Sequence, residues 1–447
     1  MKKGKELFFY VTVCAGTALS TSSFAVMAGM FEVIGGAWVL LCTLLAGLFC
    51  IAISDSVSEL ASRYPSAPGI RTFFKNAFTG KTSLFFTYFY FLFIVIIGAV
   101  ECNMFSLVFR ELFPGAHAFA VITLLLFSVL LFNLAGMELP RNLQIVSTSA
   151  VLAVMLAVGL AGVYLGWQRL PQLLAGLSGA GQWKGAPVTL GMALFLFVGF
   201  EWVTPLGWSR EAYKKLIPLS MPLGITLNLV VYVLFILGLS LILPQKTIAA
   251  GVSPHVPYVV ALFGQAGRWL AMIISAFAII STFNSGIMGG SRLVYALGRE
   301  GSLPKILTRI SGSGIPYVAI LLLGVSVYAA ALYVSAYELV LESAAAGSAI
   351  ICFIYAALVY SGRVIGQRPG QKPASYQPKF PWKFKVGLIV FLCVIGFLTL
   401  FSLPQGIVPT TLLFGLSVLL ALALAALFNG EKAPRRPMPQ ASGNLLN

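Results

Sequence analysis

The chain has 447 residues, of which 59% are hydrophobic and only 9% are charged. A soluble domain carries roughly 25% charged residues, so too little charge is present to cover a water-exposed surface of this size. The formal net charge of +16 does not indicate a nucleic-acid partner, because the charges lie in short segments between long apolar stretches. The composition excludes a soluble protein and indicates an integral membrane protein.

Membrane-spanning helices need about 20 apolar residues each. Twelve stretches of this kind follow one another along the chain: 7–30, 36–60, 82–108, 118–136, 144–166, 188–208, 220–243, 267–291, 316–335, 338–360, 386–403 and 409–428. A cytoplasmic N-terminus places 24 lysines and arginines in inside segments and five in outside segments. Since cytoplasmic loops are rich in positive residues, we expect a multi-pass protein of the cell membrane with both termini cytoplasmic.

These stretches form one polytopic domain, 1–447, with internal organisation. Stretches one to five (about 7–166) and six to ten (about 188–360) each open with a helix that carries a polar or Gly/Pro interruption. An odd number of helices per half inverts the second half relative to the first, as in many transporters. The sequence predicts an all-α membrane protein with 12 transmembrane helices. It has an inverted 5+5 repeat, two extra helices at 386–428 and a cytoplasmic tail at 429–447.

The first interruption is a run of four hydroxyl residues, Ser20, Thr21, Ser22 and Ser23, within the first apolar stretch. Ser and Thr side chains compete for backbone hydrogen bonds, so such a run at mid-membrane depth favours a broken helix. Free N–H groups, hydroxyls and the positive end of a half-helix suit a ligand carboxylate. A helix that is merely bent by its own hydroxyls is the alternative.

The second interruption lies about 180 residues later and contains Gly199, Phe200 and Thr204. Two interrupted helices at matching places in two halves of a chain are the best sequence indication of a transporter's substrate site. We therefore expect the two segments to unwind face to face and to bind substrate between them. Phe195 is a candidate wall of that site, with ordinary core packing as the alternative.

Glu201 is an ionisable residue inside the apolar stretch 188–208. Such a group near mid-membrane costs about 2.5–3.5 kcal/mol on insertion scales, so it is rarely retained without a role. It is interpreted as a proton-sensing or gating carboxylate, the alternative being a cap or a bond to a neighbouring span. Glu101, nearer the outer end of the third stretch, is interpreted as an inter-helix hydrogen bond.

Ser281, Thr282 and Asn284 form a polar cluster in the eighth stretch. The hydroxyls of Ser281 and Thr282, together with carbonyls of the first stretch, make a candidate sodium site, although no carboxylate stands beside them. Asn284 is a candidate substrate contact. The six cysteines lie in apolar stretches without CxxC spacing and there are only two histidines, so no metal site, cofactor or catalytic set is predicted.

Residues 284–304 read NSGIMGGSRLVYALGREGSLP. This segment resembles the end of the eighth span and the following loop in permeases of the amino acid–polyamine–organocation (APC) superfamily. Further likenesses to that family lie at 64–69, at 133–136 followed by Gln144, and at 197–201. They fall in the family's order over the first nine spans. The resemblance implies a LeuT-type fold and transport of an amino acid or amine by alternating access.

The resemblance also implies roles for single residues. Glu201 falls where some members place a proton-responsive carboxylate, and Phe195 where a stacking aromatic residue lies. The family's first span usually carries Gly-Ser-Gly, whose N–H groups bind the substrate carboxylate, but this chain has Ser20, Thr21 and Ser22. We therefore expect that this chain either binds the substrate carboxylate in a different way or binds a different substrate.

The sequence thus predicts a secondary active transporter of an amino acid or related amine, working as a symporter or exchanger. Protons and sodium are the candidate coupling ions. An exporter of the same fold, a channel and a membrane-embedded enzyme are the alternatives. An enzyme would need clustered His, Asp or Cys at one membrane face, which the chain lacks, so no enzymatic activity is expected. Substrate, direction and oligomeric state stay open at this stage.

Overall fold

The computed structural model describes residues 2–64, 69–135, 138–178, 182–207, 209, 211–251, 253–312, 314–368, 374–401, 403 and 406–428. This part of the chain is helical and contains no strand. The α-helices are α1 (Lys2–Ala18), α2 (Ser22–Val33), α3 (Gly36–Arg63), α4 (Ile70–Ala77), α5 (Gly80–Leu112), α6 (Ala118–Leu134), α7 (Glu138–Gly166), α8 (Leu170–Ala175), α9 (Ala186–Phe195), α10 (Ile217–Ile242), α11 (Gln245–Ala249), α12 (His255–Phe263), α13 (Ala266–Glu300), α14 (Tyr317–Ala336), α15 (Val340–Gly366), α16 (Trp382–Thr399) and α17 (Ile407–Leu427). Short 3-10 or π-helical segments are η1 (Trp167–Arg169), η2 (Gly176–Ser178), η3 (Gln182–Gly185), η4 (Phe200–Leu206), η5 (Ala212–Leu216) and η6 (Lys305–Thr308).

The apolar helices match the predicted spans closely, but the number twelve is not confirmed. In the described residues, ten helical spans are long and apolar enough to cross a membrane, or eleven when the bent pair α1 and α2 is taken as one span. The span expected at 118–136 is α6, an apolar helix of 17 residues. That length is below the roughly 20 residues of a typical spanning helix. The tail expected at 429–447 lies outside the described residues.

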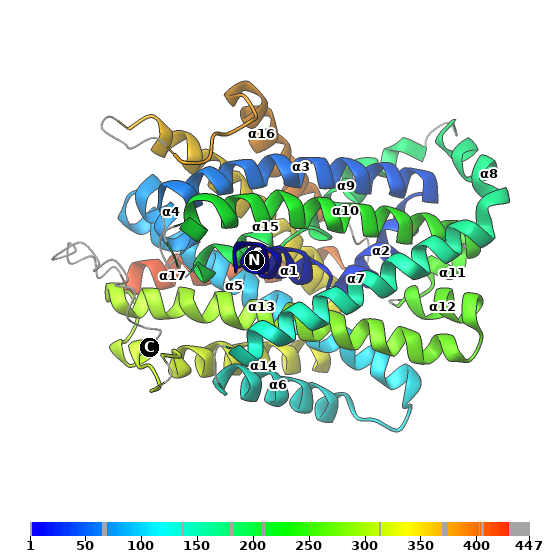
Figure 1. The fold of residues 1–447 in the computed structure, drawn as a ribbon, viewed down its shortest axis with the longest axis horizontal. Coiled ribbons are helices and arrows are strands. Elements are labelled where there is room, and N and C mark those ends of the chain that lie inside the picture. The colour runs from blue at the N-terminus through cyan, green and yellow to red at the C-terminus, as the bar shows by residue number, and fades with distance from the viewer. Residues whose placement is uncertain are drawn as a thin grey trace.

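Helix α1 runs through the middle of the bundle (Figure 1), where it contacts α7, α10 and α13. Close packing depends on Gly16, since a methyl group there would come within 2.1 Å of the hydroxyl oxygens of Ser281 and Thr148. Helices α6 and α14 lie side by side at one edge of the bundle, and α16 lies at the opposite edge. The central position of α1 places its broken end between α7, α10 and α13 and against η4.

The first predicted break is confirmed. Helix α1 ends at Ala18, α2 begins at Ser22, and their axes differ by 48°. The hydroxyls take over backbone partners at the break: Ser23 Oγ donates to the Ala18 carbonyl over 3.1 Å, and Ser20 Oγ accepts from Ser23 N over 3.3 Å. Such local bonds offer the backbone an alternative to the helical ladder, which explains why four hydroxyl residues interrupt this span.

The second predicted break is also confirmed. Helix α9 ends at Phe195, and four residues of turn follow, the last of which is Gly199 at φ 104°. A backbone angle in this region is readily adopted only by glycine. The tighter helix η4 follows, with Pro205 inside it. Proline removes one backbone donor and disfavours an α-helix, so glycine and proline together keep this span from continuing as one.

Candidate substrate site at the two helix breaks

The two breaks lie against each other. The thiol of Cys14, one turn before the end of α1, donates to the Phe200 carbonyl oxygen over 3.3 Å. A methyl group added at Gly199 would come within 2.2 Å of Cγ2 of Thr17, so the two segments approach closely at this point. The expected face-to-face arrangement is confirmed.

A carboxylate from another helix binds the first break. Glu101 of α5 accepts hydrogen bonds from Thr21 N over 3.0 Å, from Thr21 Oγ1 over 2.6 Å and from Ser22 N over 3.3 Å. The Ser22 hydroxyl also donates to it. Free N–H groups and a partial positive charge mark a helix N-terminus, so Glu101 caps α2. The inter-helix hydrogen bond expected of Glu101 is confirmed, and its partner is the break itself.

Helix α10 braces the other side of this break. The Tyr232 hydroxyl donates to the Ala18 carbonyl over 2.5 Å and lies 3.1 Å from Ser23 Oγ. Asn228 Nδ2 donates to the Ala15 carbonyl over 3.0 Å. The last turn of a helix leaves carbonyl groups without backbone partners, and Tyr232 supplies a donor to that of Ala18. The Ala15 carbonyl accepts from Leu19 N as well as from Asn228. Both ends of the break are therefore held by side chains.

Glu201 connects the second break to two long helices. Its Oε1 accepts from the Tyr90 hydroxyl of α5 over 2.9 Å, and its Oε2 accepts from the Tyr355 hydroxyl of α15 over 2.8 Å. Oε2 also accepts from Gly199 N over 3.2 Å. The side chain is fully buried. An ionised carboxylate can accept all three bonds, whereas a protonated one carries a donor of its own, so a change of protonation must rearrange this network.

Three small cavities surround Trp202 of η4, and each leaves about 20 Å³ for water. Two of them are lined by Glu101 and Thr282, and the third by Glu201 and Thr204. A volume of that size holds about one water molecule. The site is thus closed in this structure, and a substrate enters only if the helices around it move.

The structure brings half of the predicted site residues to the cavities around Trp202. Ser20, Phe195 and Gly199 line the cavity beside Glu101, and Thr204 lines the one beside Glu201. Thr21, Ser22 and Ser23 line none of the three cavities, because they bind Glu101, Ser20 and Ala18. Phe200 lines none of them either, because its ring packs against Tyr355 with centroids 5.4 Å apart.

The three polar residues predicted as a cluster in the eighth span contact different helices. Ser281 Oγ lies 2.6 Å from the Thr148 hydroxyl and accepts from Gln144 Nε2 over 2.9 Å, which ties α13 to α7. Thr282 Oγ1 donates to the Gly16 carbonyl over 3.2 Å and thereby reaches the end of α1. Asn284 donates to Gln144 Oε1 over 3.0 Å. Asn284 therefore faces α7 and lines none of the three cavities beside the breaks.

Sequence reasoning missed four residues of the site. Glu101, Trp202, Tyr90 and Tyr355 line the cavities or bind the two breaks. Glu101 carried the same signal as Glu201, an ionisable group in an apolar span. The two tyrosines carried no signal, because they stand among many aromatic residues of long apolar helices and meet Glu201 only through the fold.

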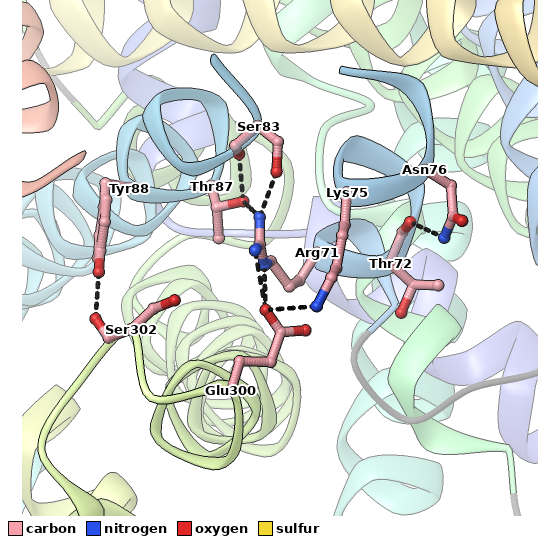
Figure 2. Close-up of polar contacts among 9 residues, drawn as sticks. All are labelled: Arg71, Thr72, Lys75, Asn76, Ser83, Thr87, Tyr88, Glu300 and Ser302. Atoms are coloured by element: carbon pink, nitrogen blue, oxygen red, sulfur yellow. Dashed lines mark hydrogen bonds and ion pairs between the residues drawn. The ribbon is translucent and has the colours of Figure 1, made fainter. Parts of the chain in front are cut away.

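The segment 284–304, which resembles the permease motif, covers the last turns of α13 and the loop after it. Glu300 pairs there with Arg71 of α4 over 2.8 Å and with Lys75 over 3.4 Å, as Figure 2 shows. The Arg71 side chain is fully buried and also donates to Ser83 over 2.5 Å. The residue after Glu300, Gly301, ends the helix at φ 81°. The ion pairs fasten α13 to α4 and α5 at one end of the bundle.

A larger cavity lies away from the breaks. It leaves about 420 Å³ and is lined almost wholly by apolar side chains of α5, α6 and α13, such as Phe105 and Leu124. Leu124 is 68% exposed in the isolated chain. In a membrane protein such a side chain faces lipid, so this groove belongs to the outer surface of the bundle.

The sequence also matches a known family. A family model described as amino acid permease matches residues 7–434. This chain belongs to the amino acid permease family. A relative named uncharacterized amino acid permease YvbW, from Bacillus subtilis, is 22% identical over 91% of this chain and 94% of its own length. The L-asparagine permease 1 of Mycobacterium tuberculosis is 24% identical over 67% of this chain and 65% of its own length.

Another relative, the uncharacterized amino acid permease YecA of Bacillus subtilis, is 26% identical, and the match spans only 60% of its length. Among solved structures, a mutant of the Eremococcus coleocola manganese transporter superposes with a TM-score of 0.62 at 13% identity and 94% coverage of both chains. The same transporter with an aromatic bis-isothiourea compound gives a TM-score of 0.56 at 14% identity, covering 92% of this chain and 94% of its own. The fold is therefore that of a LeuT-type transporter, and this permease is a multi-pass membrane protein.

Proposed function

We propose that this permease is a secondary active transporter of the cell membrane that moves an amino acid or a related amine by alternating access, as a symporter or exchanger. The observation that carries the proposal is the contact of two broken helices in the middle of the bundle, with buried carboxylates at both breaks. Backbone groups freed at mid-membrane depth are tolerated where they line a ligand cavity. A closed cavity at that depth supports alternating access rather than an open channel.

Both termini are proposed to be cytoplasmic, from the distribution of lysine and arginine. In that orientation the ion pairs of Glu300 with Arg71 and Lys75 lie at the cytoplasmic end, where they fasten α13 to α4. Substrate is proposed to bind between Ser20–Ser23 and Gly199–Thr204, with Phe195 as one wall. The likeness to a manganese transporter supports the fold alone, and the described residues hold no cluster of three His, Cys, Asp or Glu side chains placed for a metal.

The proposed coupling ion is the proton, with Glu201 as the group that senses it. Support comes from its three hydrogen bonds, which link the second break to α5 and α15 and must rearrange on protonation. Sodium at Ser281 and Thr282 is the second candidate. The Gln144 amide that donates to Ser281 makes that hydroxyl a poorer cation ligand, which favours the proton.

Counterflow in proteoliposomes tests the function. Vesicles with purified protein are loaded with one unlabelled amino acid or amine from a broad panel, and entry of the same labelled compound is followed. We expect saturable uptake of at least one compound that is stimulated by the same compound inside, with protein-free vesicles as control. Linear, unsaturable flux would indicate a channel. Absence of exchange across the panel by folded protein would refute the proposal.

A further inference from the structure

We propose that the substrate is an organic ammonium ion without a free carboxylate, and that Glu101 is its counter-ion and the specificity-determining residue. This inference rests on the proposed transport function and narrows its substrate class. It begins with the anion site that the first break creates, which this chain fills with its own Glu101 carboxylate.

The N–H groups at the start of α2 all have acceptors. Thr21 N and Ser22 N donate to Glu101, Ser23 N donates to Ser20 Oγ, and Phe24 N donates to the Thr21 carbonyl over 3.2 Å. A substrate carboxylate could bind here only by displacing Glu101. That exchange would leave a buried carboxylate without partners, which is strongly unfavourable.

The charges around the site favour a cation. Glu101 and Glu201 are both buried, and neither forms an ion pair within the described part of the chain. The residues that line the three cavities include no Lys, Arg or His. Arg292 lies beyond them, where its Nη1 donates to the Pro205 carbonyl over 3.0 Å. A substrate carboxylate would meet two like charges in a low-dielectric interior, whereas an ammonium group would meet its counter-ions.

The walls of the cavity beside Glu101 also suit an ammonium group. Phe93, Phe195 and Trp202 line that cavity together with the carboxylate. Aromatic faces attract organic cations, more so where water is excluded. The ammonium group is placed at Glu101 and the apolar part of the substrate against the rings, while the contacts of Glu101 to α2 stay in place.

Matched pairs of compounds test the proposal. The probes are phenethylamine with phenylalanine, isoamylamine with leucine, and putrescine with ornithine, added to the wider panel and measured by thermal shift and counterflow. In the pairs that bind, we expect the amine to bind at least about tenfold more tightly than its amino acid. Tighter binding of the amino acids would overturn this inference, as would exchange of panel compounds that include no amine. Either result would still support the proposed transport function. Silence across the whole panel overturns both.

Two variants of Glu101 separate a counter-ion from a structural cap. Glu101→Gln keeps an acceptor for Thr21 N but removes the charge, so amine binding should weaken at least about tenfold while the protein stays folded. In Glu101→Ala the donors of α2 are vacant, so acetate should raise its melting temperature by several degrees and partly restore amine binding. Glu111→Gln, at the end of the same helix, is the matched control and should behave as wild type. Unchanged amine binding in Glu101→Gln would refute the proposal, as would acetate insensitivity of a folded Glu101→Ala.

Discussion

The two helix breaks are held by different means, although a buried carboxylate lies at each. At the first break the carboxylate comes from α5, and the broken segment supplies the donors through Thr21 and Ser22. At the second break the carboxylate of Glu201 belongs to the broken segment, and the side-chain donors come from Tyr90 and Tyr355 on neighbouring helices, beside Gly199 N of the segment itself.

From this difference we infer which break a ligand can control. The backbone of the second break is set by its own sequence, because Gly199 and Pro205 prevent a continuous α-helix whatever surrounds them. The first break has ordinary backbone angles at Thr21 and depends on a charge from another helix. A substrate or proton that acts on Glu101 therefore changes the first break directly, whereas Glu201 transmits changes from the second break to α5 and α15.

The largest effect on stability and transport is expected for a substitution at Gly199 in the second break. Gly199→Ala places a side chain at φ 104° and within 2.2 Å of Thr17, so it should destabilise the protein by more than about 2 kcal/mol and abolish transport. The matched control is Gly387→Ala in α16, where the added methyl group meets no atom within 4 Å apart from its chain neighbours and the adjacent backbone of its own helix. Melting temperatures in detergent measure both. Equal melting temperatures would show that the second break is not constrained by its backbone.

The next effect compares the tyrosines that brace the two breaks. Tyr355→Phe removes a bond to a carboxylate and should destabilise by about 1.5–3 kcal/mol, whereas Tyr232→Phe removes bonds to a carbonyl and a hydroxyl and should lose about 0.5–1.5 kcal/mol. Thermal melts of the two variants, side by side, give the order. A greater loss in Tyr232→Phe would contradict the view that the bond to the Glu201 carboxylate is stronger than the bonds to neutral acceptors at the first break.

A smaller effect on stability, but a clear one on transport, is expected for Glu201→Gln. The amide keeps one acceptor and the volume of the side chain but cannot change its charge, so the pH dependence of uptake from about pH 5 to 8 should become flatter. Folding and substrate binding should remain. If Glu201 is only a structural tie, the variant will melt earlier and keep the wild-type pH profile.

A wild type whose uptake does not vary with pH would likewise refute the sensor role. Attention would then move to sodium. Uptake with sodium replaced by choline or potassium, in wild type and in Thr282→Val, would show whether the hydroxyl near the Gly16 carbonyl takes part.

The smallest effect is expected at the exposed pair that joins the N-terminal end of α1 to the segment after η4, Lys3 and Glu211, 2.8 Å apart. The hydrogen bond and charge of Lys3 lower the pKa of Glu211 below 4.5, and those of Glu211 raise the pKa of Lys3 above 10.5. The contribution of Glu211 is present above pH 4.5 and lost as the pH falls through its lowered pKa, and that of Lys3 is lost only as the pH rises through its raised pKa.

The pair therefore stays charged from about pH 5 to 8 and adds no pH dependence there. Exposed pairs contribute little to stability, so Lys3→Ala should leave both the melting temperature and the pH profile unchanged. A flatter profile in Lys3→Ala would assign part of the pH response to this contact and weaken the case for Glu201.

The sequence predicted the fold and both breaks because their causes are local. Hydroxyls at Ser20–Ser23, a glycine at 199 and a proline at 205 act on the backbone within a few residues of themselves. Apolar stretches likewise located the spans to within about six residues, except that α13 continues to Glu300 until Gly301 ends it. The expected end at 291 was set by the loss of apolar residues, but pairing with Arg71 keeps the polar end of the helix ordered.

The partners across the bundle could not be predicted in the same way. Glu101 meets Thr21 from 80 positions along the chain, and Tyr355 meets Glu201 from 154. Those contacts depend on how the helices pack, and single residues give no sign of them. Asn284 illustrates the converse, because its motif placed it in the right helix but its helical face turns it toward Gln144.

The closed cavities around Trp202 set a ceiling on the rate of association. Since each leaves only about 20 Å³, ligand capture must wait for the bundle to open. The observed rate will rise with ligand concentration and then level off at the rate of opening, and the apparent affinity will fall short of the intrinsic one by the fraction of open molecules. Variants that weaken the hydrogen bonds between Glu101 and the start of α2 should raise the maximal association rate before they change the dissociation rate.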